Sequence, residues 1–251
     1  MDNCDQHFTE ANFPYGIASI DSKDAVLPPR CVTRLHDSVI FLATLARAGY
    51  FADIQHDLTS IFSESTLNTF AGLGRSVHSA VRKVLQQKLK HDTLSQLPKN
   101  TAFPVKDVQM HLPVQIGDFT DFSVSVSHSL RASEVMVGKP SMPAGSAHFP
   151  IGYGGRCSSI VVSGTPVTRP MGQLSQGTGD ERRVVMAASA AMDYELELGV
   201  IIGKPLPRGK RLMAADADEH IFGFVLVNDW SGMYSLFLPF DIRRHILTIA
   251  T

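Results

Sequence analysis

The chain has 251 residues, of which 44% are hydrophobic and 19% are charged, and 23 Lys and Arg against 24 Asp and Glu give a net charge of −1. This length allows one large or two small domains with buried cores, and this composition excludes a disordered chain. The charge balance argues against a nucleic-acid-binding protein and against a polybasic membrane-surface protein.

Three cysteines, Cys4, Cys31 and Cys157, are too few and too far apart for a disulfide framework or a cysteine zinc site. They indicate reduced thiols in an intracellular compartment. The N-terminus is acidic and polar, unlike a secretory signal. The most apolar stretches, 39–51 and 221–227, are shorter than the roughly 20 residues of a membrane-spanning helix. We therefore expect a cytoplasmic protein with neither a nucleic-acid nor a membrane partner.

The first hundred residues predict short strands followed by a helix. A turn leads into a strand at 13–20, and the pattern at 39–49 fits either a strand or a short helix. After Gly74, apolar residues recur at helical spacing while polar residues occupy the other faces, which predicts a helix that ends before Pro98.

From Val108 onward, short strand-like runs alternate with Gly and Pro, which indicates a β-rich region. The polar, glycine-rich segment 172–180 predicts a surface loop. The change of pattern near 100–110 predicts a boundary between two domains, 1–107 and 108–251.

Alternating polar and apolar residues at 193–202 predict a strand with Glu195 and Glu197 on one face. This pattern fits a strand with one solvated face. It also fits a cation site, because two adjacent carboxylates repel each other unless a hard cation such as Ca²⁺ or Mg²⁺ lies between them.

A second carboxylate follows the apolar run 220–227, which predicts a strand buried on both faces. The run ends at Asn228 and Asp229. Asp229 fits either a turn-forming residue or a functional residue at the end of a strand.

Two further segments offer polar chemistry. Asp118 and Asp121 precede His128, so that one loop offers a ligand and a general base, although the chain has ten histidines. The glycine-rich segment around Tyr153 and Arg156 fits either an ordinary turn or a loop that presents a phenol and a guanidinium to an anion.

Motifs of several other chemistries are absent from the sequence: the G-x-S-x-G elbow, the phosphate-binding loop, H-E-x-x-H and the dinucleotide fingerprint. Serine nucleophiles, NAD and zinc therefore have little support.

Five collinear segments resemble the fumarylacetoacetase family, also called the fumarylacetoacetate hydrolase family, from about residue 10 to Ser231. The segments are 66–74, 110–122, 150–173 with Val161-Val162-Ser163-Gly164-Thr165-Pro166, 192–197 with Met192-Asp193-Tyr194-Glu195-Leu196-Glu197, and 220–231 with Asn228-Asp229-Trp230-Ser231.

The resemblance implies a mainly β (α+β) fold with an SH3-like N-terminal β domain, followed by an incomplete mixed β-roll domain of the fumarylacetoacetase type. It also implies metal-dependent hydrolysis of a C–C bond in a β-diketone acid. In this reaction fumarylacetoacetate and water give fumarate and acetoacetate, in tyrosine and phenylalanine catabolism.

The same resemblance implies the site residues. It makes His128 the base that activates water and Tyr153 a substrate contact. The ligands of the divalent metal, Ca²⁺ or Mg²⁺, would be Asp121, Glu195, Glu197 and Asp229. A Lewis-acidic cation at this place would polarise the diketone and stabilise the developing negative charge.

Two positions depart from the family pattern around the site. Ser123 stands where the family has a tyrosine that contacts substrate. A family arginine after the histidine has no equivalent, because 129–140 diverges and Val137 is nearest its place. The loss of a phenol and a guanidinium should weaken the binding of an anionic substrate.

The resemblance stops at Ser231, so we expect a C-terminally truncated chain with a divergent tail at 232–251. In the family, the missing part supplies a glutamate that orients the histidine, residues near the developing charge, and part of the dimer interface. Two alternatives to the hydrolase are therefore open. One is an inactive member that acts as a binding or dimerisation partner, in a homodimer or a heterodimer with a full-length homologue. The other, indicated by Ser123 and by the divergent segment 129–140, is a hydrolase of a secondary-metabolite diketone.

Overall fold

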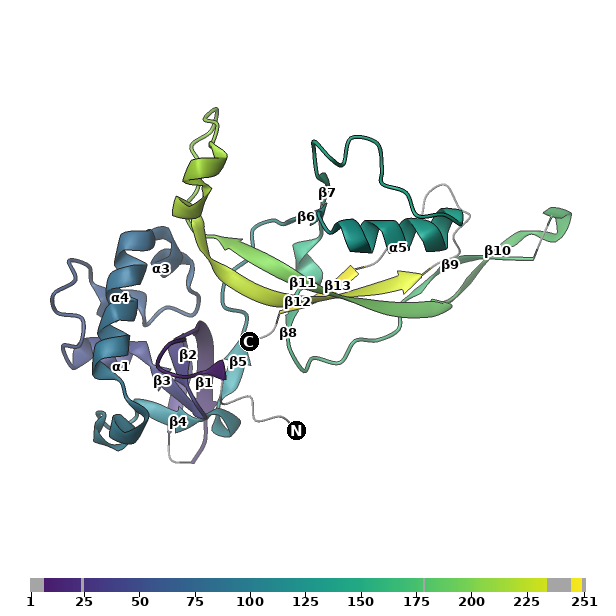
Figure 1. Cartoon of the computed structure of the whole chain (residues 1–251). Coiled ribbons are helices and arrows are strands. Elements are labelled where there is room, and N and C mark those ends of the chain that lie inside the picture. The colour runs from purple at the N-terminus through teal and green to yellow at the C-terminus, as the bar shows by residue number, and fades with distance from the viewer. Residues whose placement is uncertain (1–6, 24, 178, 234–244, 250–251) are drawn as a thin grey trace. The chain divides into compact units, whose positions relative to one another are not determined.

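The computed structural model of the chain describes residues 7–23, 25–177, 179–233 and 245–249 (Figure 1). The fold is mainly β, with antiparallel pairing and few helices. The chain divides into two compact units. The first holds Met1–Gln115 and Leu198–Leu226, and the second holds Ile116–Glu197 and Val227–Thr248.

The first unit contains a five-stranded sheet in the order β4-β3-β2-β1-β5, and each neighbouring pair is antiparallel. Its strands are β1 (Tyr15–Asp21), β2 (Val26–Leu35), β3 (Ser38–Phe41), β4 (Ala102–Pro104) and β5 (Gln109–His111). Buried side chains such as Ile17, Val32 and Ile40 form the core. Hydrophobic burial of this kind is the main stabilising force of such a sheet.

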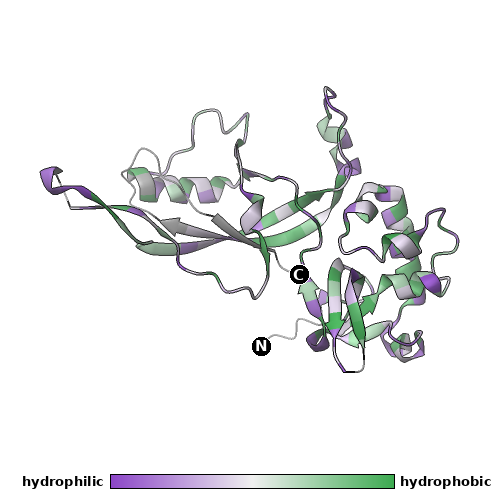
Figure 2. Cartoon of the chain, turned by 180° about the vertical axis from the view of Figure 1, so that it is seen from behind, coloured by the Kyte–Doolittle hydropathy of each residue, from purple (hydrophilic) through white to green (hydrophobic). Residues whose placement is uncertain are grey.

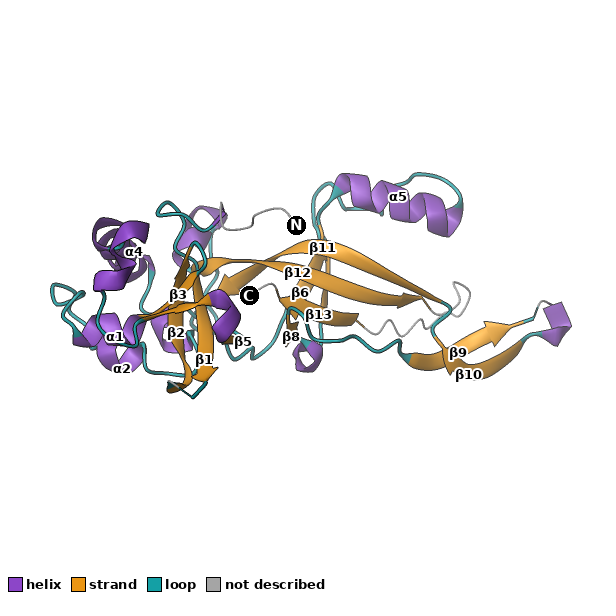
Figure 3. Cartoon of the chain, turned by 90° about the horizontal axis from the view of Figure 1, so that it is seen from below, coloured by secondary structure: helices purple, strands orange, loops and turns teal. Residues whose placement is uncertain are grey.

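The α-helices of the first unit lie along one side of this sheet (Figures 1 and 3). They are α1 (Leu42–Arg47), α2 (Leu58–Ile61), α3 (Asn68–Gly72) and α4 (Arg75–Lys88). The unit also contains the 3₁₀ helices η2 (His91–Gln96) and η3 (Val105–Asp107), and η6 (Ala214–Glu219), which lies between β11 and β12 in sequence. In the part of the chain that the structure describes, no helix is both long and apolar enough to cross a membrane.

Two predictions for this unit have clear outcomes. The ambiguous stretch 39–49 contains both elements, because β3 ends at Phe41 and α1 begins at Leu42. The helix expected after Gly74 begins at Arg75, and Gly74 suits this start because its φ of +89° favours glycine. The α-helix ends earlier than predicted, at Lys88, because Leu89 turns to an extended conformation in which its side chain is fully buried.

An aromatic cluster centres on Phe70 of α3. Its ring centroid lies 5.1 Å from those of Tyr15 and Phe62, 4.9 Å from that of His78 and 5.7 Å from that of Phe222. Edge-to-face contacts of this kind add to the burial energy of each ring. The cluster therefore links Phe222, which is distant in sequence, to the N-terminal helices of the same unit.

The remaining strands form a four-stranded sheet in the order β11-β12-β13-β8 and two separate pairs, β6-β7 and β9-β10. Their bounds are β6 (Thr120–Ser123), β7 (Ile151–Gly154), β8 (Val161–Val162), β9 (Met171–Gln176), β10 (Arg183–Ala188), β11 (Ala191–Ile202), β12 (Ile221–Met233) and β13 (His245–Ile249). One α-helix, α5 (Val126–Val137), and the 3₁₀ helices η4 (Cys157–Ser159) and η5 (Gly179–Glu181) are also described here. Strands β11 and β12 each contribute residues to both units.

The surface loop predicted at 172–180 is wrong over most of its length. Strand β9 occupies Met171–Gln176 and pairs with β10 as an antiparallel ribbon (Figure 3). The six paired residues run from Met171 opposite Ala188 to Gln176 opposite Arg183. The polar sequence of β9 carries little strand signal of its own, and its partner strand decides its conformation.

The predicted burial of β12 is also wrong, because Phe224 and Leu226 are 60% and 54% exposed. On β11 the apolar residues Leu196 and Leu198 are 74% and 65% exposed, while Glu197 is half-buried. The solvated face of these strands thus carries apolar side chains. In Figure 2, which colours the ribbon by hydropathy, parts of both strands are green. The strand also continues past Asn228 and Asp229 to Met233, so Asp229 lies within β12 rather than at its end.

Candidate active site

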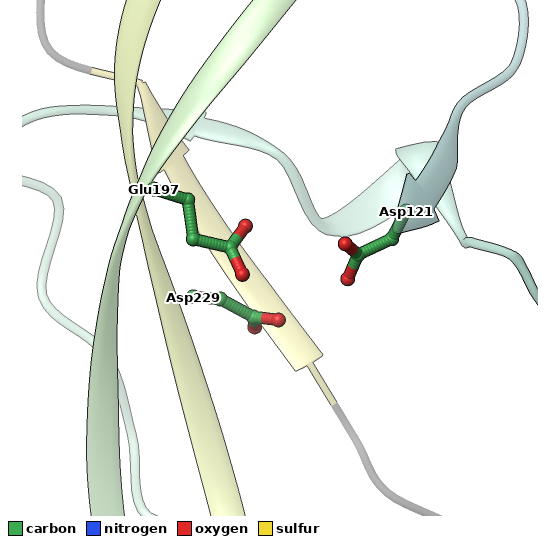
Figure 4. A group of neighbouring side chains, drawn as sticks. All are labelled: Asp121, Glu197 and Asp229. Atoms are coloured by element: carbon green, nitrogen blue, oxygen red, sulfur yellow. The ribbon is translucent and has the colours of Figure 1, made fainter. Parts of the chain in front are cut away.

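Three carboxylates from three strands converge in the second unit. Asp121 comes from β6, Glu197 from β11 and Asp229 from β12, and one oxygen of each lies within 4.8 Å of the others (Figure 4). Two oxygens that each lie about 2.3–2.6 Å from a Ca²⁺ ion can be separated by up to about 5 Å. The donor set and its spacing therefore fit a hard divalent cation.

Neighbouring strands hold two of these carboxylates. β11 and β12 are adjacent, and residues at every second position share a face, so Glu197 and Asp229 project from one side of the sheet. Asp229 is only 1% exposed. A buried carboxylate beside two others is electrostatically unfavourable unless positive charge compensates for it.

The third carboxylate depends on the β6-β7 pair. In this pair Asp121 lies opposite Tyr153, and the Tyr153 hydroxyl donates a hydrogen bond of 2.5 Å to Oδ2 of Asp121. Oγ1 of Thr120 donates to the carbonyl oxygen of Tyr153 at 2.9 Å. These bonds fix both the strand pair and the carboxylate that it carries.

Glycines allow β7 and the residues after it to approach two aromatic rings. A Cβ atom on Gly152 would lie 2.6 Å from the ring of Phe122, and one on Gly155 would lie 1.8 Å from the ring of Phe119. Both distances are shorter than a non-bonded carbon contact allows. A side chain at Gly152 or Gly155 would therefore displace the ring that packs against it.

The pKa of the Tyr153 phenol is raised well above its ordinary value. Burial is the largest cause, followed by the hydrogen bond to Asp121 and by the negative charges of Asp121, Asp229 and Glu197. The phenol therefore stays protonated at neutral pH and acts as a hydrogen-bond donor.

His128 lies in the first turn of α5. The hydroxyl of Ser125 caps this helix by accepting a hydrogen bond of 3.3 Å from the backbone N–H of His128. Nε2 of His128 lies 3.4 Å from Oε1 of Glu195. Among the described residues, Glu195 thus faces the histidine, whereas Asp121, Glu197 and Asp229 form the carboxylate cluster.

The other candidate residues make local contacts. Oδ1 of Asp118 accepts a hydrogen bond from the N–H of Phe119 at 2.8 Å. Ser123 is exposed at the end of β6, opposite Ile151. Nη2 of Arg156 donates to Oγ of Ser159 at 3.3 Å.

The single loop expected for Asp121 and His128 is instead a strand followed by a helix. Two contacts are not indicated by the sequence pattern, the bond from Tyr153 to Asp121 and the approach of Glu195 to His128. Both join residues more than thirty positions apart in the chain. A prediction that β6 pairs with β7 would have indicated the first of them.

Comparison with protein families gives two consecutive matches. The family model described as Fumarylacetoacetase N-terminal matches residues 11–113, and that described as Fumarylacetoacetate (FAA) hydrolase C-terminal matches residues 122–237. The second match contains Glu197 and Asp229 and extends past Ser231, where the resemblance was expected to stop. Asp121 lies immediately before it.

Curated relatives agree with the family models. Over 261 residues, the chain is 35% identical to Fumarylacetoacetase fahA of Aspergillus fumigatus, covering 96% of this chain and 60% of the relative. Identity to the fumarylacetoacetase of Oryza sativa subsp. japonica is 37% over 232 residues, with coverages of 90% and 53%. For the human fumarylacetoacetase the identity is 35% over 236 residues, with coverages of 90% and 54%.

The chain therefore spans a little more than half the length of the curated relatives that it matches. Across that span, both family models match in consecutive order and the relatives share one name. On these matches, the chain belongs to the fumarylacetoacetase family.

Proposed function

We propose that the chain is a metal-dependent hydrolase that cleaves a C–C bond of a β-diketone acid. The proposed reaction converts fumarylacetoacetate and water into fumarate and acetoacetate, as in tyrosine and phenylalanine catabolism. The observation that supports it best is the convergence of Asp121, Glu197 and Asp229 in a chain whose relatives are named fumarylacetoacetases.

The three carboxylates would hold the divalent cation, either Ca²⁺ or Mg²⁺, because both ions prefer oxygen ligands. A cation at this place supplies Lewis acidity and stabilises the negative charge that develops on the diketone oxygens. Glu195 would serve as a fourth ligand if its side chain turned from His128 toward the cluster.

His128 would act as the general base. If its Nε2 proton faces Glu195, Nδ1 is left to accept a proton from the attacking water, and the carboxylate stabilises the resulting imidazolium. The water oxygen bonds to the carbonyl carbon of the fumaryl group, and the C–C bond to the acetoacetate part breaks. The carbon that leaves keeps the electron pair and takes up a proton.

Tyr153 and Ser123 would contact the substrate. Both lie on the β6-β7 pair that carries Asp121, so a substrate bound at the cation would lie near them. Ser123 is smaller than the tyrosine of the family pattern, which leaves room for a larger or differently substituted diketone.

Loss of fumarylacetoacetate absorbance tests this function directly. We expect the purified chain to consume the substrate with Ca²⁺ or Mg²⁺ present and to lose that activity in a chelator. Substitution His128→Ala should reduce the rate at least about 100-fold, the usual contribution of a positioned base, and leave cation affinity nearly unchanged.

The matched control is His148→Ala, since His148 is exposed in the same unit and does not belong to the carboxylate cluster. Its rate should equal that of the parent chain. Turnover that persists in the chelator would contradict metal dependence, and an active His128→Ala variant would contradict the role of the base. No turnover with either cation, in a chain that binds both, would refute the hydrolase.

A second candidate is a binding role without catalysis, as a homodimer or as a heterodimer with a full-length homologue. The exposed apolar side chains of β11 and β12, such as Leu198 and Phe224, favour it, because exposed apolar patches mark interaction surfaces. A homologue that co-elutes with this chain, in the absence of turnover, would support it.

Four further expectations remain predictions: the SH3-like and β-roll character of the two parts, the domain limits 1–107 and 108–251, a divergent tail and the cytoplasmic location. The tail was expected at 232–251, and the family match, which reaches residue 237, leaves only 238–251 for it. Most of the tail lies outside the described residues.

A further inference from the structure

We propose that Tyr153 is a positioning residue that holds the carboxylate of Asp121 in the orientation needed to bind a cation together with Glu197 and Asp229. The inference rests on the proposed cation site and adds a role to Tyr153 besides substrate contact. The hydroxyl of Tyr153 is directed at Asp121, 2.5 Å from Oδ2.

A single donor can determine how a carboxylate presents its lone pairs. A hydrogen bond to one oxygen fixes the rotation of the group about its bond to Cβ, and the other oxygen is left for a ligand. Metal-binding carboxylates are commonly held in this way by neighbouring donors, and removal of such a donor typically weakens metal binding 10- to 100-fold.

The donor in turn has a fixed position. Tyr153 lies opposite Asp121 in the β6-β7 register, and Oγ1 of Thr120 donates to its carbonyl oxygen. The N–H of Gly155 donates to the carbonyl oxygen of Phe119 at 3.0 Å, which extends the same register. Slippage of either strand would separate the phenol from the carboxylate.

The position of the Asp121 carboxylate depends on such a donor more than the positions of the other two carboxylates do. Glu197 and Asp229 project from adjacent strands of one sheet, so their separation follows from strand geometry. Asp121 belongs to a separate two-stranded pair, and its approach to the other two depends on its own side chain and on Tyr153.

Terbium binding tests the inference without reference to activity. Tb³⁺ is a hard cation, and Trp230, the only tryptophan of the chain and the neighbour of Asp229, can sensitise its emission. We expect Tyr153→Phe to weaken Tb³⁺ binding at least about tenfold and to increase the number of bound waters derived from emission lifetimes in H₂O and D₂O.

Tyr194→Phe is the matched control, because Tyr194 is 65% exposed on β11 and its ring lies 6.3 Å from that of Trp230. It removes the same hydroxyl from the same unit and should leave Tb³⁺ affinity unchanged. Circular dichroism of both variants checks that they are folded.

A double-mutant cycle separates the outcomes. If Tyr153 acts through Asp121, the pair Asp121→Asn and Tyr153→Phe should bind Tb³⁺ no more weakly than Asp121→Asn alone. Additive losses, or unchanged affinity in Tyr153→Phe, would overturn the inference and leave the cation site intact. A folded parent chain that binds no Tb³⁺ would overturn the cation site itself and this inference with it.

Discussion

At the scale of single residues, the carboxylate cluster brings three groups of like charge close together. Asp229 is 1% exposed and shares the cluster with Asp121 and Glu197. Like charges about 5 Å apart repel each other by roughly 1–3 kcal/mol, depending on the local dielectric constant. Neutralising one carboxylate should therefore stabilise the cation-free protein. It should also reduce the stabilisation that an added cation provides.

We predict this behaviour for Asp229→Asn. In a chelator its melting temperature should exceed that of the parent chain by about 2–4 °C, which corresponds to about 1 kcal/mol in a chain of this size. Added Ca²⁺ should raise the melting temperature of the parent chain and not that of the variant, because only binding to the folded state stabilises it. Equal responses of the two proteins to Ca²⁺ would contradict the participation of Asp229.

A second residue-scale prediction concerns His78 of α4. Burial lowers its pKa from the ordinary value of 6.5, opposed by the hydrogen bond of 2.8 Å between its Nε2 and the carbonyl oxygen of Phe70. At this residue, the unfolded chain therefore binds more protons than the folded one in the interval between the folded-state pKa and about pH 6.5. The contribution of neutral His78 to stability is complete above that pH and is lost as the pH falls through the folded-state pKa.

Urea midpoints from about pH 7.5 to about pH 5.5 measure this contribution. The free energy of unfolding of the parent chain should decrease over this interval. The glutamine of His78→Gln can still donate a hydrogen bond to the carbonyl oxygen of Phe70, but it does not titrate. The free energy of unfolding of this variant should therefore decrease less over the same pH interval. Parallel pH profiles for the two proteins would show that His78 does not contribute.

The cluster could be predicted from sequence only in part. The spacing of Glu195 and Glu197 indicated a shared face, and both side chains are half-buried. It could not indicate that Glu195 faces His128 while Glu197 faces Asp229, because that difference depends on which strand or helix lies beside each position. The bond between Tyr153 and Asp121 likewise follows from a strand pairing that links distant segments.

At the scale of elements, the β6-β7 pair is the structure on which Asp121 depends. Its close packing requires glycine at 155, where a Cβ atom would lie 1.8 Å from the ring of Phe119, whereas a Cβ atom on Gly154 would meet nothing within 4 Å. The neighbouring glycines therefore form a matched pair for substitution.

We predict that Gly155→Ala destabilises the protein by about 1–3 kcal/mol, the usual cost of overpacking, and that Gly154→Ala costs much less. Gly155→Ala should also weaken cation binding, because displacement of Phe119 shifts the strand that carries Asp121. Thermal melts and Ca²⁺ titrations of both variants check this. Equal effects of the two substitutions would argue against the proposed packing constraint.

Elements with a strong local pattern were predictable. The helix after Gly74 follows from apolar residues at helical spacing, of which Val81 and Leu85 are buried, and β11 follows from its alternation. Strand β9 was not predictable, because its sequence resembles a loop and its partner β10 determines its conformation. The end of α4 at Lys88 similarly depends on the burial of Leu89, a tertiary effect.

At the scale of the whole molecule, the sheet formed by β11 and β12 has two unlike sides. Because side chains alternate along a strand, the apolar residues at even positions lie on the side opposite Glu197 and Asp229. We call five of them, which all belong to the first unit, the apolar patch: Leu198, Val200, Ile202, Phe224 and Leu226, which are 45–65% exposed. Contiguous exposed patches of this kind promote association.

The last prediction is that the 251-residue chain associates through the apolar patch. Size-exclusion chromatography with light scattering should give a mass above the 27.4 kDa of one chain, increasing with concentration. The double variant Leu198→Lys and Phe224→Lys should remain monomeric at the same concentrations, because two charges on exposed positions break the patch at little cost in stability. Val26→Lys is the control, since Val26 is 72% exposed on β2, outside the patch, and its substitution should leave the association unchanged. A parent chain that is monomeric at every concentration, or a double variant that associates as strongly as the parent, would contradict the prediction.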